Sequence, residues 1–219
     1  VIIRAGFGWD EPKQKDNMFE SHYKNAKAAG LKIGAYHYSY ATNKQQATRE
    51  AYTFMDYIKG KEFDYPVFYD VEDAVQSKLS GDQIAEIMVT FGDILEGNGY
   101  YIGMYSYVSM MKKIPYEKIK RFTLWVAQYY SVLQYPHYAA MWQYTSTGKV
   151  DGYSGNIDKN YLYEDYAQII KDRGGNPVKK VAVESDSDKL KKAIEQISKL
   201  EIENNLQKEK LNKIAEILK

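Results

Sequence analysis

Tyr65-Pro66-Val67-Phe68-Tyr69-Asp70-Val71-Glu72 is an apolar stretch that ends in two acidic residues. It predicts a buried strand, and because side chains two positions apart on a strand share a face, Asp70 and Glu72 are expected to point the same way. Two carboxylates on such a strand are costly unless they face a polar cleft. The C-terminal end of a barrel strand is also where barrel enzymes carry their chemistry. The pair is therefore a candidate reactive site, with a metal site or a solvent-exposed strand end as the alternatives.

Strands and helices alternate on both sides of this stretch. Further strands are predicted at 1–6, 32–38, 100–107, 123–127 and 140–144. Residues 152–157 lead into the last predicted strand. Helices are predicted at 16–30, 45–58 and 84–97, the last capped by Ser80, and a short helix or turn at 114–120. Such alternation predicts a parallel sheet, and the last strands follow one another with little helix between them. An incomplete or modified α/β barrel fits this order better than a nucleotide-binding sheet, because no glycine-rich phosphate loop follows a strand.

The composition of the 219 residues excludes several classes of protein. Lys and Arg total 30 against 29 Asp and Glu, so the basic excess typical of nucleic-acid-binding proteins is absent. Without cysteine there can be no disulfide, cysteine-based zinc site or thiol catalysis. No apolar run is long enough to predict a membrane-spanning helix, and no signal peptide is recognised. His22, His37 and His137 show no metal-ligand spacing, so no metal site is predicted, and His37 is expected to be structural.

Tyrosine is unusually frequent, at 22 residues. Its flat apolar ring with a polar edge suits sugar rings, although a tyrosine-rich core would give the same count. Hydrolysis of a glycosidic bond needs two carboxyl groups: one donates a proton to the leaving oxygen, and the other stabilises positive charge, acts as a nucleophile or orients an attacking group. Burial and mutual repulsion would raise one pKa of the pair Asp70 and Glu72. Position alone does not show which of the two is the acid.

Seven segments, in order along residues 1 to about 165, resemble glycoside hydrolase family 25, the Chalaropsis-type lysozymes. They are Val1-Ile2-Ile3-Arg4-Ala5-Gly6-Phe7-Gly8, the helix with Asp16-Asn17-Met18-Phe19, the strand Gly34-Ala35-Tyr36-His37-Tyr38-Ser39-Tyr40-Ala41, the acidic Asp70-Val71-Glu72, Trp125-Val126-Ala127, Met141-Trp142-Gln143-Tyr144, and Gly152-Tyr153-Ser154-Gly155-Asn156-Ile157-Asp158. The order of seven segments is more specific than any single motif.

The resemblance implies a fold and an activity. The expected fold is an irregular TIM-like (β/α)5β3 barrel, and the expected reaction is hydrolysis of the β-1,4 bond between N-acetylmuramic acid and N-acetylglucosamine in bacterial peptidoglycan, without a metal or organic cofactor. Glu72 corresponds to the general acid. Asp70 would assist by orienting the substrate's 2-acetamido group or by tuning Glu72, and Asp158 would hydrogen-bond substrate or water.

Aromatic and polar residues on the predicted strands are candidate sugar contacts. They are Tyr36, Tyr38, Tyr105, Trp125 and Trp142, joined by Gln143 and Arg4. Tyr38 and Trp125 are favoured because they lie near strand ends, while ordinary core packing remains the alternative for each aromatic residue. Arg4 lies on a strand expected to be buried and needs an anionic partner, either a carboxylate of the site or a structural ion pair.

The sequence departs from the family pattern at its start. Family members open with a strand carrying D-x-S, whose aspartate belongs to the catalytic carboxylates, whereas Val1 stands at the following strand. The expected barrel therefore lacks its first strand, and a catalytically incomplete cell-wall-binding module is the alternative to an active muramidase. A chitinase is a third hypothesis, although chitinases carry a longer run of spaced acidic residues. The expected location is the bacterial cell wall, reached by secretion or by release of a phage endolysin.

The C-terminal part of the chain differs in pattern from the rest. A barrel domain is predicted at 1–172, a linker at 173–187 and a single helix without Gly or Pro at 188–219. Leu190, Ile194 and Ile197 are spaced as in a coiled-coil seam, which is interrupted further on. This helix predicts homo-oligomers, with packing on the barrel or a cell-wall contact as the alternatives.

Overall fold

The computed structural model describes residues 1–9 and 11–178, which belong to one compact unit. Most of the predicted linker and the predicted helix at 188–219 lie outside the described residues. The element order of the compact unit follows the strand–helix alternation of the sequence. None of the described helices is long and apolar enough to span a membrane.

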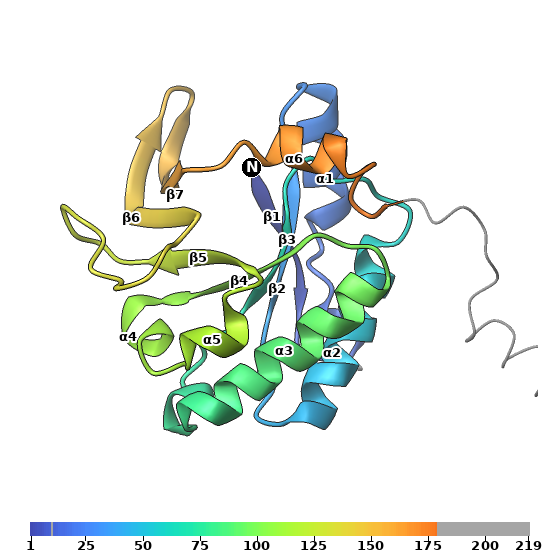
Figure 1. The fold of residues 1–219 in the computed structure, drawn as a ribbon. Coiled ribbons are helices and arrows are strands. Elements are labelled where there is room, and N and C mark those ends of the chain that lie inside the picture. The colour runs from blue at the N-terminus through green and yellow to red at the C-terminus, as the bar shows by residue number, and fades with distance from the viewer. Residues whose placement is uncertain (10, 179–219) are drawn as a thin grey trace, which may run out of the picture. The chain divides into compact units, whose positions relative to one another are not determined.

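The centre of the unit is a seven-stranded sheet in which the strands lie side by side in chain order. The strands are β1 (Ile2–Phe7), β2 (Gly34–Tyr38), β3 (Val67–Asp70), β4 (Ile102–Tyr107), β5 (Thr123–Ala127), β6 (Met141–Val150) and β7 (Tyr153–Leu162). β1 to β6 are parallel, and β7 pairs antiparallel with β6 in a long hairpin. Figure 1 shows the sheet curling from β1 round to this hairpin, so the α/β fold has the form of a half-barrel.

Helices connect the strands from β1 to β5, and one more helix follows β7. They are α1 (Phe19–Ala28), α2 (Lys44–Ile58), α3 (Gly81–Gly97), α4 (Val108–Met111), α5 (Tyr116–Ile119) and α6 (Tyr166–Asp172), with 3₁₀ turns η1 (Pro12–Gln14) and η2 (Gln76–Lys78). Local signals set the ends of the long helices: the side chain of Asn43 caps α2, and Ser80 caps α3 in a capping box with Gln83. Gly30, at φ 70°, follows α1 in a conformation that favours glycine.

Two apolar clusters lie on opposite faces of the sheet, as strand alternation requires. On the outer face Tyr69 and its neighbours pack with residues of α2 and α3 such as Phe54 and Phe91. On the inner face lie Phe68, Tyr105, Trp125, Ala127, Ala140, Met141, Tyr166 and Ile170. A Cβ atom at Gly103 would stand 2.4 Å from the ring of Phe68, so this glycine on β4 makes room for the aromatic ring on β3.

Three local features differ from the sequence expectation. β3 ends at Asp70, so Glu72 lies two residues beyond the strand. Helix α6 was not predicted, although Asp165 caps it. Residues 173–178, expected to begin a linker, lie against the sheet because the buried Asn176 accepts from the Tyr101 amide and donates to the Tyr65 carbonyl, both at 2.9 Å.

Candidate active site

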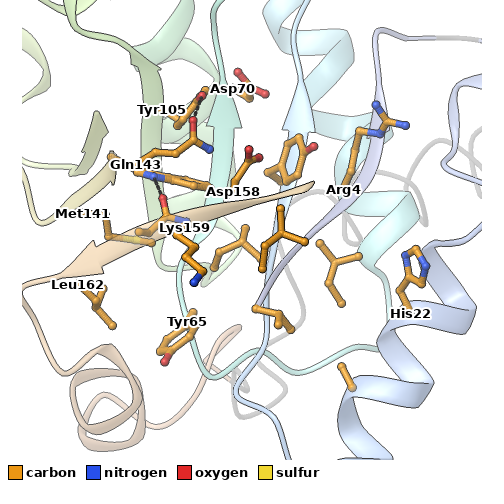
Figure 2. A pocket seen from close by; sticks show the side chains of 18 of the residues that line it. Arg4, His22, Tyr65, Asp70, Tyr105, Met141, Gln143, Asp158, Lys159 and Leu162 are labelled. Atoms are coloured by element: carbon orange, nitrogen blue, oxygen red, sulfur yellow. Dashed lines mark hydrogen bonds between the residues drawn. The ribbon is translucent and has the colours of Figure 1, made fainter. Parts of the chain in front are cut away.

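A groove of about 1050 Å³ opens on the inner face of the sheet between β1 and β7. Its lining includes Arg4, Tyr36, Asp70, Glu72, Tyr105, Trp125, Gln143 and Asp158. Figure 2 shows Asp70, Tyr105, Gln143 and Asp158 toward one end of the groove, with Arg4 on the β1 side. The structure therefore brings together every candidate side chain from the sequence except Tyr38 and Trp142.

Asp70 and Glu72 differ in how far they are buried. Asp70 is only 5% exposed, and its Oδ1 has no hydrogen-bond partner, whereas Glu72 is half-buried in the groove wall. Burial, and then the charge of Glu72, raise the pKa of Asp70 well above its ordinary value, although Arg4 lowers it. Burial also raises the pKa of Glu72, which the hydrogen bond from Tyr105 lowers and the charges of Asp158 and Asp73 raise further. The pair therefore holds a proton to higher pH than isolated carboxyl groups would.

Asp158 and Arg4 bring further charge to the groove. Asp158 is exposed on β7, and partial burial of its carboxyl group raises its pKa. Arg4 is exposed rather than buried, and its Nε donates to Oδ2 of Asp16 at 2.8 Å. The partner of Arg4 is thus a loop carboxylate outside the groove lining, while its charge still reaches Asp70.

A hydrogen-bonded row of polar side chains leads from the groove to Glu72. Oε1 of Gln143 accepts from the hydroxyls of Tyr105 and Tyr129, both at 3.0 Å. Tyr105 is 7% exposed and Tyr129 is 55% exposed, so the row runs from solvent to the buried side of the groove. The Tyr105 hydroxyl also lowers the pKa of Glu72, so the row contributes to the surroundings of the candidate acid.

Trp125 forms part of the groove wall and of the inner core at the same time. Its ring is 7% exposed and meets the rings of Phe68 and Tyr105 edge to face, at 5.0 and 4.7 Å. Its Nε1 donates to Oδ1 of Asn160 on β7 at 2.8 Å. Trp125 therefore packs in the core and lines the groove, as both alternatives for this residue proposed.

Tyr38 and Trp142 do not line the groove. The hydroxyl of Tyr38 donates to Oδ2 of Asp73 at 3.0 Å, which places Tyr38 beside the segment that follows Glu72. Trp142 donates through Nε1 to the carbonyl of Gln128 at 2.8 Å and packs against Tyr161. Both residues therefore lie outside the lining of this groove, and sugar stacking there stays a prediction.

Among the residues that sequence reasoning missed are Asn160, in the groove lining, and Tyr129, which hydrogen-bonds Gln143. Tyr129 lies in a loop after β5, and Asn160 lies opposite Gln143 in the β6–β7 pairing. The only signal in the sequence was that polar and aromatic residues follow strand ends. Within residues 1–9 and 11–178, no three His, Asp or Glu side chains gather as a metal-binding group.

Comparison with known proteins assigns the fold and the acidic segment to one family. The model of glycosyl hydrolases family 25 matches residues 2–153, which is more than half of the chain. The chain belongs to glycosyl hydrolases family 25. The family match includes Asp70, Glu72, Tyr105 and Gln143, and ends before Asp158 on β7.

Individual relatives of this family 25 chain include the autolytic lysozyme of Clostridium acetobutylicum, 33% identical over 152 residues, or 68% of this chain and 45% of that protein. The CTP1L endolysin structure superposes with a TM-score of 0.64 at 28% identity, covering 78% of this chain and 60% of that one. The catalytic domain of endolysin ply40, from bacteriophage P40 of Listeria monocytogenes, gives 0.64 at 26% identity, covering 80% and 85%. The chain spans about half the length of the curated relatives it matches.

Proposed function

We propose that this family 25 chain is a muramidase, which hydrolyses the β-1,4 bond between N-acetylmuramic acid and N-acetylglucosamine in bacterial peptidoglycan. The observation that carries the proposal is the carboxyl pair Asp70 and Glu72, whose pKa values are raised at the wall of an aromatic groove. A raised pKa keeps a carboxyl proton available near neutral pH, as general-acid catalysis of glycoside hydrolysis requires. The similarity to an autolytic lysozyme and to two endolysins supports the choice of substrate.

The two carboxyl groups take different roles because their exposure differs. Glu72, half-buried in the groove wall, can reach a bound glycan and donates its proton to the glycosidic oxygen. Asp70 is nearly inaccessible, which favours an indirect role beside Glu72, whose charge in turn raises the pKa of Asp70. Asp158, exposed on β7, is available to hydrogen-bond the substrate or a water molecule.

Saccharide binding is assigned to the groove wall. Tyr36, Tyr105 and Trp125 offer aromatic surface, and Gln143 and Arg4 offer hydrogen-bond donors. Tyr129, exposed at the end of the hydrogen-bonded row, joins this set. The proposed complete fold is the irregular (β/α)5β3 barrel, and the proposed place of action is the bacterial cell wall, after secretion or release.

The test is release of reducing ends from purified peptidoglycan by the full chain. Glu72→Gln should lower the rate by on the order of 100-fold or more, because general-acid catalysis is lost. Glu86→Gln, at an exposed position on α3, is the matched control and should leave the rate unchanged. Binding to peptidoglycan without release of reducing ends would instead favour the cell-wall-binding module, and equal rates for wild type and Glu72→Gln would remove Glu72 from its role.

We also propose that the chain associates with a second copy of itself through residues 188–219. The support is the spacing of Leu190, Ile194 and Ile197 in the sequence. Light scattering of the full chain should give a multiple of the chain mass, and Leu190→Lys with Ile194→Lys should reduce it to a single chain. A single-chain mass for the wild type would refute the proposal.

A further inference from the structure

A carboxyl group lies buried behind the groove, on the outer face of the sheet. Glu50 belongs to α2 and is 0% exposed, on the same side of the helix as Ala47, Ala51 and Phe54. A buried carboxylate is costly unless hydrogen bonds surround it. The groove chemistry described above does not use Glu50, so the presence of a carboxyl group at this depth needs a separate reason.

The carboxyl group of Glu50 is surrounded by donors from the segment after β2 and from β3. Oε1 accepts from the amide of Tyr40 at 2.7 Å. Oε2 accepts from the hydroxyl of Ser39 at 2.8 Å and from the hydroxyl of Tyr69. The ring of Tyr69 is itself fixed, because it lies 3.7 Å from the ring of Phe91 at an interplanar angle of 8°. Glu50 therefore ties the residues that follow β2 to the side chain before Asp70 on β3.

A second layer of hydrogen bonds extends from Ser39 to the loop after Glu72. Nε2 of the buried Gln76 donates to the hydroxyl of Ser39 at 2.8 Å and to the carbonyl of Ala41 at 3.0 Å. Oε1 of Gln76 accepts from the amide of Asp73 at 3.1 Å. The loop that leaves Glu72 is thus joined to the same cluster.

The cluster reaches the acidic segment 70–72 from both ends. The amide of Ser39 donates to the carbonyl of Asp70 at 2.8 Å, so the main chain at Asp70 depends on the position of Ser39. Past Glu72, Asp73 is held by Gln76 and by the hydroxyl of Tyr38. Glu50 lies at the centre of these contacts and touches neither Asp70 nor Glu72 in any of them.

We propose that Glu50 is a positioning residue for the catalytic segment, which it holds through Ser39 and Tyr69. This rests on the proposed muramidase function. The physical reason is that only an acceptor can satisfy the Tyr40 amide and the two hydroxyls at once, whereas an apolar residue would leave buried donors without partners. A small displacement of Asp70 or Glu72 relative to a bound substrate is enough to lower the rate of catalysis.

Three variants of the full chain separate positioning from general stabilisation. Glu50→Ala removes the acceptor, and Glu50→Gln keeps Oε1 for the Tyr40 amide while the two hydroxyls can turn to accept from Nε2. Ile58→Ala is the matched control, since Ile58 is also 0% exposed on α2 but lies two turns further on. Each protein is assayed well below its own melting temperature, for kcat and KM on soluble peptidoglycan fragments.

The expected result is a change in kcat that does not follow the loss of stability. Glu50→Ala should lower kcat about tenfold or more with KM changed less than about twofold, and Glu50→Gln should restore kcat to within about threefold of wild type. Ile58→Ala should lower the melting temperature and leave kcat unchanged. Equal kcat values for Glu50→Ala and Ile58→Ala would overturn the proposal. If Glu50→Ala does not fold, Tyr69→Phe carries the test, because it removes one donor and keeps the ring, and an unchanged kcat there would overturn it.

A readout without turnover distinguishes this proposal from the proposed function. The titration of the Asp70 carboxyl carbon is followed by NMR in wild type and in Glu50→Ala, or in Tyr69→Phe if the former does not fold. If the cluster keeps Asp70 buried, its midpoint should fall toward the ordinary aspartate value in the variant. An unchanged midpoint would refute the positioning role even if the wild type releases no reducing ends, a result that by itself refutes only the muramidase assignment.

Discussion

Tyr105 on β4 and Gln143 on β6, both in the groove lining, are joined by a 3.0 Å hydrogen bond from the tyrosine hydroxyl to Oε1. The same hydroxyl lowers the pKa of Glu72, which burial raises. The position of one tyrosine thus links the groove lining to the protonation of the candidate acid.

Tyr105→Phe should move the alkaline limb of the activity profile to higher pH. Without the hydroxyl, the carboxylate of Glu72 loses a donor, so its pKa rises further and the acid keeps its proton over a wider range. The measurement is kcat/KM against pH for both proteins. A limb that stays in place or moves to lower pH would show that Tyr105 does not tune Glu72.

His37 should make the protein less stable in acid. The ring is 0% exposed, and burial lowers its pKa to about 3. Since an unfolded chain binds the proton near the ordinary value of 6.5, the stability due to neutral His37 is complete above that pH and is lost as the pH falls toward 3. Urea unfolding of His37→Gln should show a smaller loss over this range than wild type, and a parallel loss in both proteins would contradict the assignment.

Glu50 should make the protein less stable as the pH rises, which is the opposite of the effect of His37. Burial raises its pKa to about 7 from the ordinary value of 4.5, so between these values the folded state binds a proton that the unfolded chain has released. This contribution to stability is complete below pH 4.5 and is lost as the pH rises through 7. The free energy of unfolding of Glu50→Gln should therefore decline less than that of wild type between these values, and an identical decline would mean that Glu50 does not titrate there.

Gly103→Ala should destabilise the fold by about 1–3 kcal/mol, the usual cost of adding a methyl group to a packed core. Its Cβ would lie 2.4 Å from the ring of Phe68 on the adjacent strand. Gly97→Ala is the control, because the space around its Cβ is open. Chemical unfolding measures both, and equal stabilities would show that the Phe68 ring moves aside without cost.

Local sequence signals were sufficient to predict most of the strands and helices. Asn43 and Ser80 cap their helices by contacts within three residues, and the alternation on β3 places Phe68 and Asp70 on the inner face. Such features depend on neighbours in sequence, which is why residues 1–6, 123–127 and the three long helices could be predicted. Helix α6 is only seven residues long and carries a weak pattern, so it was missed.

Site residues that lie on a single segment of the chain could be predicted, whereas contacts between a loop and a distant strand could not. Asp70 and Glu72 follow from a single segment, but Tyr129 reaches Gln143 only through the course of the loop after β5. The β6–β7 pairing contains register shifts, so strand alternation alone could not place Asn160 against Trp125. Tyr38 was expected in the groove from its place near a strand end, but its hydroxyl donates to Asp73, in the loop after β3.

The identity of the new reducing end tests the muramidase assignment most directly. Peptidoglycan digested by the full chain is reduced with borohydride, and the terminal sugar alcohols are identified by mass spectrometry. Cleavage of the β-1,4 bond from N-acetylmuramic acid to N-acetylglucosamine leaves N-acetylmuramic acid as the new reducing end, which borohydride converts to N-acetylmuramitol. Wild type and Glu86→Gln should form this product, and Glu72→Gln should not. Formation of N-acetylglucosaminitol, or of no new sugar alcohol, would contradict the account.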